Sequence, residues 1–412
     1  MDKYTALRSR TIVASADILK ISAEAKKDNY ENKIDASIGV FLNDDKTLNG
    51  VRLIKANIGK DIPNNLNYPP ISGQPIYKEA VSKWLFREYY DKFTSSYSVP
   101  FCATLGGTGA CFISFKTFLE KGEKVLLPSL MWNNYQLIAS EAGIGFDTYE
   151  IFDSNQNFNI DNLIQKIKQY QKVQQNVLVV INDPCQNPTG YSLSSEEYQK
   201  LFVSLNEITK LGNITILFDV AYLDYDRADL SSHKLFKAIN SFNPQFLCMF
   251  AFSCSKTFGM YGLRTGALLG LTKSEEVSVN IVNSACCIAR GTYSCPTGSA
   301  IIAVSNSLLD NKARQDIENN ILANMNILHL RGRHLIDTLD KYNIKHTKYS
   351  NGFFITLYIN NSPLVTAKLK EKHMYVVPLD NSHIRLALSS LKDDEIDTLI
   401  YTMSEVIKTI NE

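Results

Sequence analysis

One lysine, Lys256, follows an apolar run at residues 246–251 that is typical of a buried strand. Burying an unpaired ammonium is costly, and burial lowers the pKa of a lysine, which makes its amine nucleophilic. The reaction that suits such an amine is Schiff-base formation with a carbonyl compound. The alternative interpretation is a loop lysine whose charged tip simply reaches water.

Groups able to hold a phosphate lie near this lysine in the sequence. Ser253, Ser255 and Thr257 lie beside it and Arg264 follows it, and hydroxyl and guanidinium groups both bind phosphate oxygens. A glycine-rich turn at residues 104–110 contains Gly107 and Thr108 and leads into a helix, whose first N–H groups favour an anion. Such a turn can also lack a ligand. Aldehyde chemistry beside a phosphate site indicates pyridoxal 5'-phosphate (PLP) as the cofactor.

Four other residues have side chains that this cofactor could use. Asp219 ends an apolar run at residues 214–218 and could pair with a protonated pyridine nitrogen, or it could cap the next segment. Asn187, in an Asn-Pro-Thr-Gly turn, and Tyr222 could both donate to the phenolate oxygen. Trp132 could cover the ring face, although a core tryptophan is an equal alternative.

Two arginines could bind a substrate carboxylate. Arg385 lies in an apolar strand-like run at residues 384–388, where a guanidinium needs a carboxylate either from the protein or from a substrate. Arg290 follows an apolar helix, and most such arginines are solvated. The six histidines lack the spacing of two ligands on one helix face, so we expect no metal site.

The elements that must position these residues alternate between strands and helices. Before the sheet, the sequence predicts a helical segment up to about residue 30, a strand-like run at residues 34–41 and an amphipathic helix at about residues 74–93. The glycine-rich turn leads into a helix at residues 111–119. Apolar strands at residues 125–127, 177–181 and 214–218 alternate with helical segments, which is the pattern of a parallel α/β sheet. One of these helical segments begins near Ser194, where residues 194–197 have the spacing of a capping box. Ligands bind at the carboxyl ends of strands in such sheets. Asp219 and Lys256 both follow strands, so we expect them to meet there.

Beyond residue 342 the pattern changes to short strands and helices, and 412 residues are too many for one simple core. The predicted fold class is α/β. It comprises a large PLP-binding domain with a mostly parallel central sheet flanked by helices, and a smaller α+β domain formed by both chain termini. The predicted limits are 1–48 and 319–412 for the small domain and 49–318 for the large domain.

Composition excludes several classes of partner. The formal net charge is +1, which argues against nucleic-acid binding. No stretch is apolar for the roughly 20 residues needed to span a bilayer, and the first residues do not resemble a secretory signal. The 8 cysteines show no Cys-x-x-Cys spacing, so we expect a reducing, cytoplasmic location.

The combination of these motifs resembles the class I aminotransferases of the aspartate and aromatic amino-acid group, which are fold-type-I PLP enzymes. The resemblance extends from about Gly39 to Arg385. It depends on four motifs in the family's order: Asn187-Pro188-Thr189-Gly190, Asp219-x-x-Tyr222, Ser253-x-Ser255-Lys256, and Arg264.

The resemblance implies a role for each matching residue toward the cofactor. Lys256 would be the Schiff-base lysine and the general base, and Trp132 would stack on the ring. Asp219 would pair with the pyridine nitrogen, while Asn187 and Tyr222 would hold the phenolate oxygen. The phosphate would be bound by a further set: Gly107, Thr108, Ser253, Arg264 and, from the other subunit of a homodimer, Tyr68.

The resemblance also implies a substrate site. Arg385 would bind the α-carboxylate, with Gly39, Trp132 and Asn187 close to the substrate. Arg290 of the partner subunit would bind a side-chain carboxylate. The family's motif at this place is Arg-Pro-Met-Tyr-Ser, whereas this chain has Arg-Gly-Thr-Tyr-Ser. Because glycine adds backbone freedom, the direction of the Arg290 side chain can differ from that in the family. Two other departures are Gly106, where serine is usual, and Leu263, where glutamate is common. We expect both to adjust the phosphate contacts.

The predicted function is therefore a PLP-dependent aminotransferase with a ping-pong mechanism. It would move an amino group between aspartate, glutamate or an aromatic amino acid and a 2-oxo acid such as 2-oxoglutarate or oxaloacetate. Two alternatives stay open. One is a PLP-dependent β-lyase or β-decarboxylase on the same fold, and the other is a non-catalytic PLP-binding regulator, which would need an added DNA-binding segment.

Overall fold

The computed structural model describes residues 17–50, 54, 57–58, 67–226, 230 and 233–411. The first described helix is α2 (Asp17–Lys27). It accounts for part of the helical segment expected before residue 30, and the rest of that segment lies outside the described residues.

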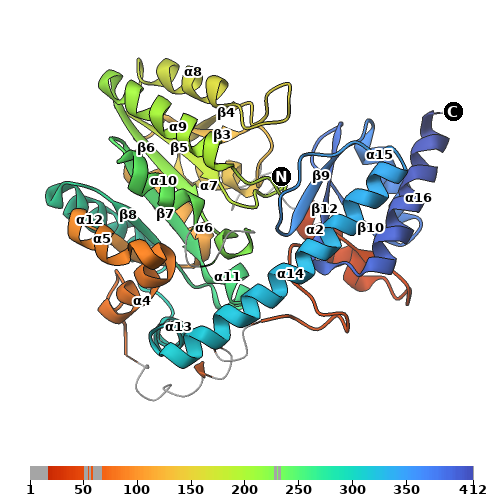
Figure 1. Ribbon diagram of the computed structural model, residues 1–412, viewed down its shortest axis with the longest axis horizontal. Helices are drawn as coiled ribbons and strands as arrows, with labels where there is room; N and C mark the ends of the chain where they lie inside the picture. Colours follow the sequence, from red (N-terminus) through yellow and green to blue (C-terminus); the bar gives the residue numbers. More distant parts are fainter. Residues whose placement is uncertain are drawn as a thin grey trace, which may run out of the picture.

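A seven-stranded sheet forms the centre of the larger part of the molecule (Figure 1). Its strands are β2 (Phe101–Thr104), β3 (Lys124–Pro128), β4 (Gly145–Tyr149), β5 (Asn176–Asn182), β6 (Asn213–Asp219), β7 (Leu247–Ser253) and β8 (Gly266–Leu271). The order is β2-β8-β7-β6-β5-β3-β4, and β4, β3, β5, β6 and β7 are mutually parallel. Only β8 runs antiparallel to its neighbours β7 and β2. The predicted mostly parallel sheet is confirmed.

Helices cover both faces of this sheet, because the side chains of its strands are apolar on both sides. In β5, Val177 and Val179 join one core, whereas Leu178 and Val180 join the other. The second core is closed by α6 (Gly106–Phe118), α7 (Asn134–Ala142) and α12 (Glu275–Thr292). The first is closed by α4 (Pro75–Phe86), α5 (Tyr90–Ser96), α8 (Ile160–Tyr170), α9 (Ser195–Ile208), α10 (Lys234–Phe242) and α13 (Gly298–Leu309).

The smaller part combines both ends of the described chain. The parallel pair of β1 (Ile34–Asp35) with β10 (Met374–Tyr375) joins the N-terminal segment to the C-terminal one. The other strands are β9 (Phe354–Tyr358), β11 (Val377–Pro378) and β12 (His383–Ala387), and the helices are α2, α15 (Ser362–Lys370) and α16 (Asp393–Asn411). A separate core fills this part, so the predicted α+β domain is confirmed.

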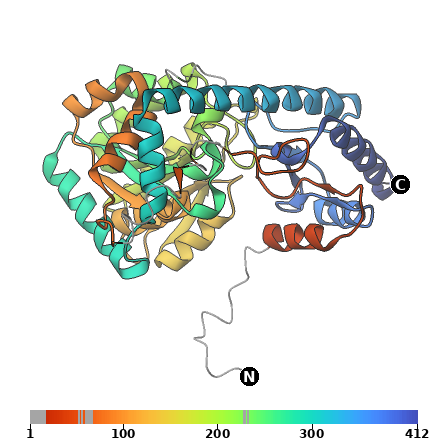
Figure 2. The same cartoon turned by 90° about the horizontal axis from the view of Figure 1, so that it is seen from below.

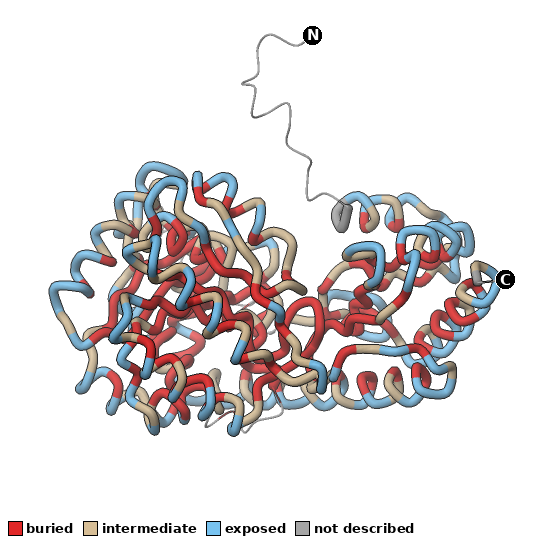
Figure 3. The backbone as a smooth tube through the Cα atoms, turned by 90° about the horizontal axis from the view of Figure 1, so that it is seen from above, coloured by how far each residue is buried: buried red, intermediate tan, exposed pale blue. Residues whose placement is uncertain are grey.

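One long helix, α14 (Asn311–Lys341), connects the two parts (Figure 2). Its first turns lie beside α13, and its last turns pack in the core of the smaller part. Buried residues, drawn in red, lie inside both of the parts that α14 connects (Figure 3). Helix α14 continues without a break through residue 318, so no change of secondary structure marks the predicted domain limit at 318/319. This limit and the one at 48/49 stay predictions.

Local structure differs from expectation in two places. The helix expected at residues 74–93 breaks at Arg87, whose φ of +52° ends α4 and begins a short 3-10 helix, η2 (Arg87–Tyr89). The strand expected at residues 34–41 is only two residues long, because the chain then leaves the small domain toward Lys256. By contrast, the capping box predicted at Ser194 is confirmed, with both of its hydrogen bonds to Glu197 present.

A search of the described residues for membrane spans found no helix with the length and hydropathy that a span requires.

Candidate active site

Three neighbouring strands bring polar residues to one edge of the sheet. In the parallel register Asn182, the last residue of β5, lies opposite Asp219, the last residue of β6. Strand β7 ends at Ser253 and continues directly into a four-residue helix, α11 (Cys254–Thr257), which carries Lys256. The expected convergence at the carboxyl ends of the strands is therefore present.

The amine of Lys256 points toward the smaller part of the molecule. Its Nζ donates a hydrogen bond of 2.6 Å to the carbonyl oxygen of Gly39. The rings of Tyr261, Tyr222 and Phe353 lie 4.8, 5.7 and 5.6 Å from the same nitrogen. Burial is the main cause that lowers the pKa of Lys256 to about 7, and the positive charges of Arg385 and Arg264 contribute to this shift. A large fraction of this amine is therefore neutral and nucleophilic near neutral pH.

Asp219 is buried, and a tyrosine that sequence analysis missed is bonded to it. The hydroxyl of Tyr135 donates to its Oδ2, and the N–H of Ala221 donates to its Oδ1 at 3.2 Å. Burial raises the pKa of Asp219, and these two hydrogen bonds oppose that rise. Tyr135 lies in the first turn of α7, three residues after Trp132, and the two rings meet edge to face at 5.3 Å. A tyrosine three positions after Trp132 was the available signal.

Arg385 is a buried cation whose hydrogen bonding is incomplete. Its Nη2 donates to the carbonyl of Ser37 at 2.6 Å, and its Nη1 donates to Oδ1 of Asn187 at 3.4 Å. Its Nε has no hydrogen-bond partner among the described residues, and burial lowers its pKa to about 10. The guanidinium lies 4.5 Å from the ring of Phe354. The sequence left open whether the carboxylate for Arg385 comes from the protein or from a substrate. These contacts favour a substrate carboxylate, because no protein carboxylate of the described residues bonds the guanidinium.

Asn187 and Tyr222 lie between this arginine and the sheet edge. The N–H of Asn187 donates to Oδ1 of Asn182 at 2.8 Å, which fixes the turn. Burial raises the pKa of Tyr222, and the amide of Asn187 opposes that rise by hydrogen bonding. The two side chains are thus neighbours, as the phenolate role requires.

The residues expected to hold a phosphate lie close together where α6 begins. The glycine-rich stretch was expected to precede a helix starting near residue 111, but α6 begins at Gly106, so Gly107 and Thr108 form its first turn. The N-cap residue makes no side-chain cap, which leaves the first N–H groups available for an anion. A Cβ added at Gly107 would lie 3.4 Å from Ser253, and one at Gly106 would lie 2.8 Å from Nη2 of Arg264.

Two predicted site residues do not join this group within one chain. Tyr68 is 90% exposed and hydrogen bonds none of the residues that the structure describes. Arg290 is exposed in the last turn of α12, where its Nη1 donates to Oγ of Ser294 at 2.7 Å. Their predicted roles depend on a second subunit.

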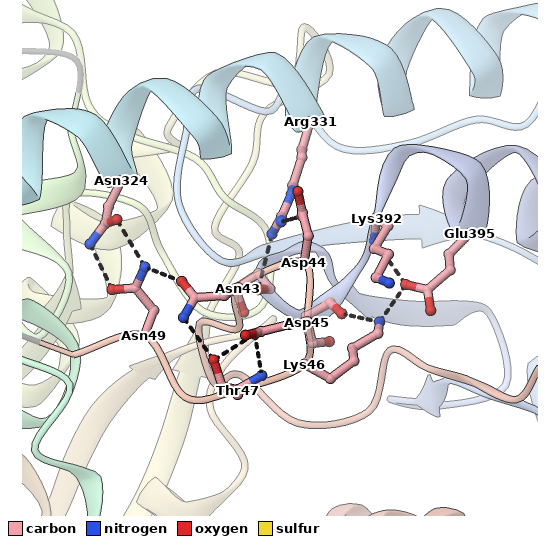
Figure 4. Close-up of polar contacts among 12 residues, drawn as sticks. Asn43, Asp44, Asp45, Lys46, Thr47, Asn49, Asn324, Arg331, Lys392 and Glu395 are labelled. Atoms are coloured by element: carbon pink, nitrogen blue, oxygen red, sulfur yellow. Dashed lines mark hydrogen bonds and ion pairs between the residues drawn. The ribbon is translucent and has the colours of Figure 1, made fainter. Parts of the chain in front are cut away.

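The segment that carries Gly39 is fixed on both sides. The N–H of Phe41 donates to the hydroxyl of Tyr261 at 3.0 Å, on the large part of the molecule. A polar network then ties the following turn to α14 and α16 (Figure 4). Its main contacts are Asp44 with Arg331, Lys46 with Glu395, and Asn49 with Asn324.

Comparison with known proteins agrees with this architecture. The family model described as "Aminotransferase class I and II" matches residues 31–402. A mitochondrial aspartate aminotransferase of Saccharomyces cerevisiae is 26% identical over 98% of this chain and 96% of that protein. The crystal structure of an aminotransferase from Anaerococcus prevotii is 26% identical, with a TM-score of 0.89 over 98% of this chain and 99% of that one.

A third relative has the same fold at lower identity. It is an aromatic-amino-acid aminotransferase from Burkholderia pseudomallei, covalently bound to pyridoxal phosphate, with 21% identity and a TM-score of 0.80 over 98% of this chain and all of that one. The resemblance predicted from the motifs is confirmed: this chain belongs to the class I and II aminotransferases.

Proposed function

We propose that this protein is a PLP-dependent aminotransferase that exchanges an amino group between an L-amino acid and a 2-oxo acid by a ping-pong mechanism. The proposal depends above all on one observation. The amine of Lys256, whose pKa burial lowers to about 7, lies at the same sheet edge as the buried carboxylate of Asp219 and near the buried guanidinium of Arg385.

The residues present fit PLP. Asp219 would hold the pyridine nitrogen, and Trp132 would cover the ring. Asn187 and Tyr222 would hold the phenolate oxygen. The phosphate would enter the cradle formed by the first turn of α6 with Ser253 and Arg264, because glycine at 106 and 107 leaves the space that a Cβ would fill. When bound, PLP supplies an aldehyde carbon and a ring that withdraws electrons from the substrate Cα.

The chain's own residues would then do three things. The amine of Lys256 would hold PLP at its aldehyde carbon, with water as the leaving group, and as a free neutral amine it would accept the proton from the substrate Cα. Asp219 would keep a proton on the ring nitrogen, and the hydrogen bond from Tyr135 would keep Asp219 ionised. Arg385 would use its unpartnered Nε to hold the α-carboxylate, which orients the Cα–H bond toward the lysine.

Substrate choice would depend on Arg290 of a partner subunit in a homodimer. In support, Arg290 and Tyr68 are both exposed in the single chain. A well-aimed Arg290 would favour aspartate and glutamate, whereas a displaced one would favour aromatic donors. Light scattering after size exclusion tests the dimer, and an active monomer would contradict it. A cytoplasmic location stays part of the proposal, and subcellular fractionation tests it.

The test of the proposed reaction is product analysis. Protein and PLP are incubated with each amino donor and 2-oxoglutarate, and every product is quantified by mass spectrometry. Equal amounts of glutamate and the donor's 2-oxo acid would support transamination. Pyruvate with ammonia, or carbon dioxide, formed without glutamate would instead support a β-lyase or a β-decarboxylase. Arg290→Gln should lower turnover of dicarboxylic donors more than of aromatic donors.

A further inference from the structure

We propose that Asp224 and Thr257 are positioning residues that fix the short helix carrying Lys256. This inference rests on the proposed function of Lys256. It concerns residues that lie behind the site and would touch neither cofactor nor substrate.

The contacts are made by the backbone of the lysine and by the side chain of the next residue. The hydroxyl of Thr257 donates to Oδ2 of Asp224 at 2.8 Å, and the hydroxyl of Tyr225 donates to the carbonyl of Lys256 at 3.0 Å. Asp224 and Tyr225 belong to one 3-10 helix, η4 (Leu223–Tyr225), which directly follows Tyr222. The segment that presents Tyr222 therefore also holds the backbone of the lysine in place.

Asp224 is able to act as a rigid support because several donors hold its carboxylate. It is completely buried, and it accepts from Nη2 of Arg87 and from Nε1 of Trp84, both at 3.1 Å. Arg87 stacks 3.7 Å from the ring of Trp84 and also pairs with Glu318 of α14 at 2.7 Å. A buried carboxylate with this many partners has little freedom to move.

The position of Lys256 needs such a support. Helix α11 has only four residues, too few to be rigid alone. The lysine amine must reach both the aldehyde carbon and the substrate Cα, and a shift of about 1 Å in such a group can lower a rate about a hundredfold. Loss of the Thr257 hydroxyl would free one end of the helix and leave Oδ2 of Asp224 with the indole N–H of Trp84 as its remaining donor.

The experiment compares matched threonine variants of the PLP-loaded enzyme. Thr257→Val removes the hydroxyl, and Thr257→Ser keeps it. Thr338→Val is the control, because the Thr338 hydroxyl is also buried and also lies near a carboxylate, Oδ1 of Asp397 at 3.3 Å, in the other domain. The readouts are kcat and KM per PLP-bearing site, the Tm, and the midpoint pH of the change in the visible absorption band.

Thr257→Val should lower kcat about tenfold with KM changed less than about twofold, and should move the midpoint pH by roughly half a unit or more. Thr257→Ser should restore wild-type values, and Thr338→Val should lower only the Tm. Wild-type kcat and midpoint pH in Thr257→Val, with only the Tm lowered, would overturn the positioning role. A wild-type enzyme that lacks the visible band would refute the proposed function itself, and the positioning role with it.

Discussion

The ammonium of Lys256 should destabilise the folded, cofactor-free protein, and this effect can be measured. Its pKa is about 7 in the folded chain, against an ordinary value of 10.5. Between these two pH values the unfolded chain holds a proton that the folded chain lacks, so stability should rise with pH. The full interval corresponds to about 5 kcal/mol at 1.36 kcal/mol per pH unit. Because the side chain is partly exposed, we expect about 2–4 kcal/mol after solvent screening.

Lys256→Met removes the amine and keeps an apolar chain of similar length. Below pH 7 Lys256 is protonated in both the folded and the unfolded wild-type chain, so the folded chain has the full unfavourable free energy of a buried ammonium. The free energy of unfolding of the variant should therefore be about 2–4 kcal/mol higher than that of the wild type. At pH 9.5 the amine is neutral in the folded chain, so the difference in free energy of unfolding between variant and wild type should fall to less than about half of its value below pH 7. Urea unfolding of the cofactor-free proteins between pH 6.5 and 9.5 measures this difference.

A second lysine provides the control. Glu79 raises the pKa of Lys83, so that amine stays protonated in both states throughout this pH range. Lys83→Met should therefore change the free energy of unfolding by an amount that does not vary with pH. A pH-independent difference for Lys256→Met as well would refute the conclusion that burial keeps the Lys256 amine neutral.

Three further predictions concern other parts of the site. Arg385→Lys should lower kcat/KM about 10- to 100-fold, mostly through KM, because a lysine cannot bind a carboxylate at two points; steady-state kinetics would show this, and an unchanged KM would contradict it. Gly106→Ala should weaken PLP binding about tenfold, because φ is +70° and the new Cβ would press on Arg264; titration of the cofactor-free protein measures the affinity, and wild-type affinity would exclude the cradle. Tyr135→Phe removes a hydrogen bond that lowers the pKa of Asp219, so this pKa should rise further and kcat should fall about tenfold or less. A loss of PLP content without a change in kcat would show that the hydrogen bond between Tyr135 and Asp219 serves only PLP binding.

Much of this arrangement could be predicted because its signals are local. The strands before Asp219 and Lys256 are continuous apolar runs, and the topology of parallel sheets requires their carboxyl ends to meet. The helix start at Ser194 was equally clear, because a capping box is a short sequence pattern.

The remainder depends on contacts between distant residues. Gly39 and the amine of Lys256 are bonded although they are 217 positions apart, and no local pattern announces that pair. The helix break at Arg87 was missed because the apolar periodicity continues through it, whereas burial of the guanidinium against Asp224 and Glu318 accompanies the break. The role of Tyr68 was predicted only from the resemblance, because the contacts that it would make lie between two chains.

The visible absorption spectrum would show whether Lys256 carries PLP and exchanges amino groups. The PLP-loaded protein is mixed with aspartate, glutamate, tyrosine or alanine separately, with no 2-oxo acid present. At least one dicarboxylic or aromatic donor should abolish the long-wavelength band, 2-oxoglutarate should restore it, and Lys256→Met should never show this reversible exchange. A band that no amino acid changes, or the same exchange in Lys256→Met, would show that Lys256 does not perform this chemistry.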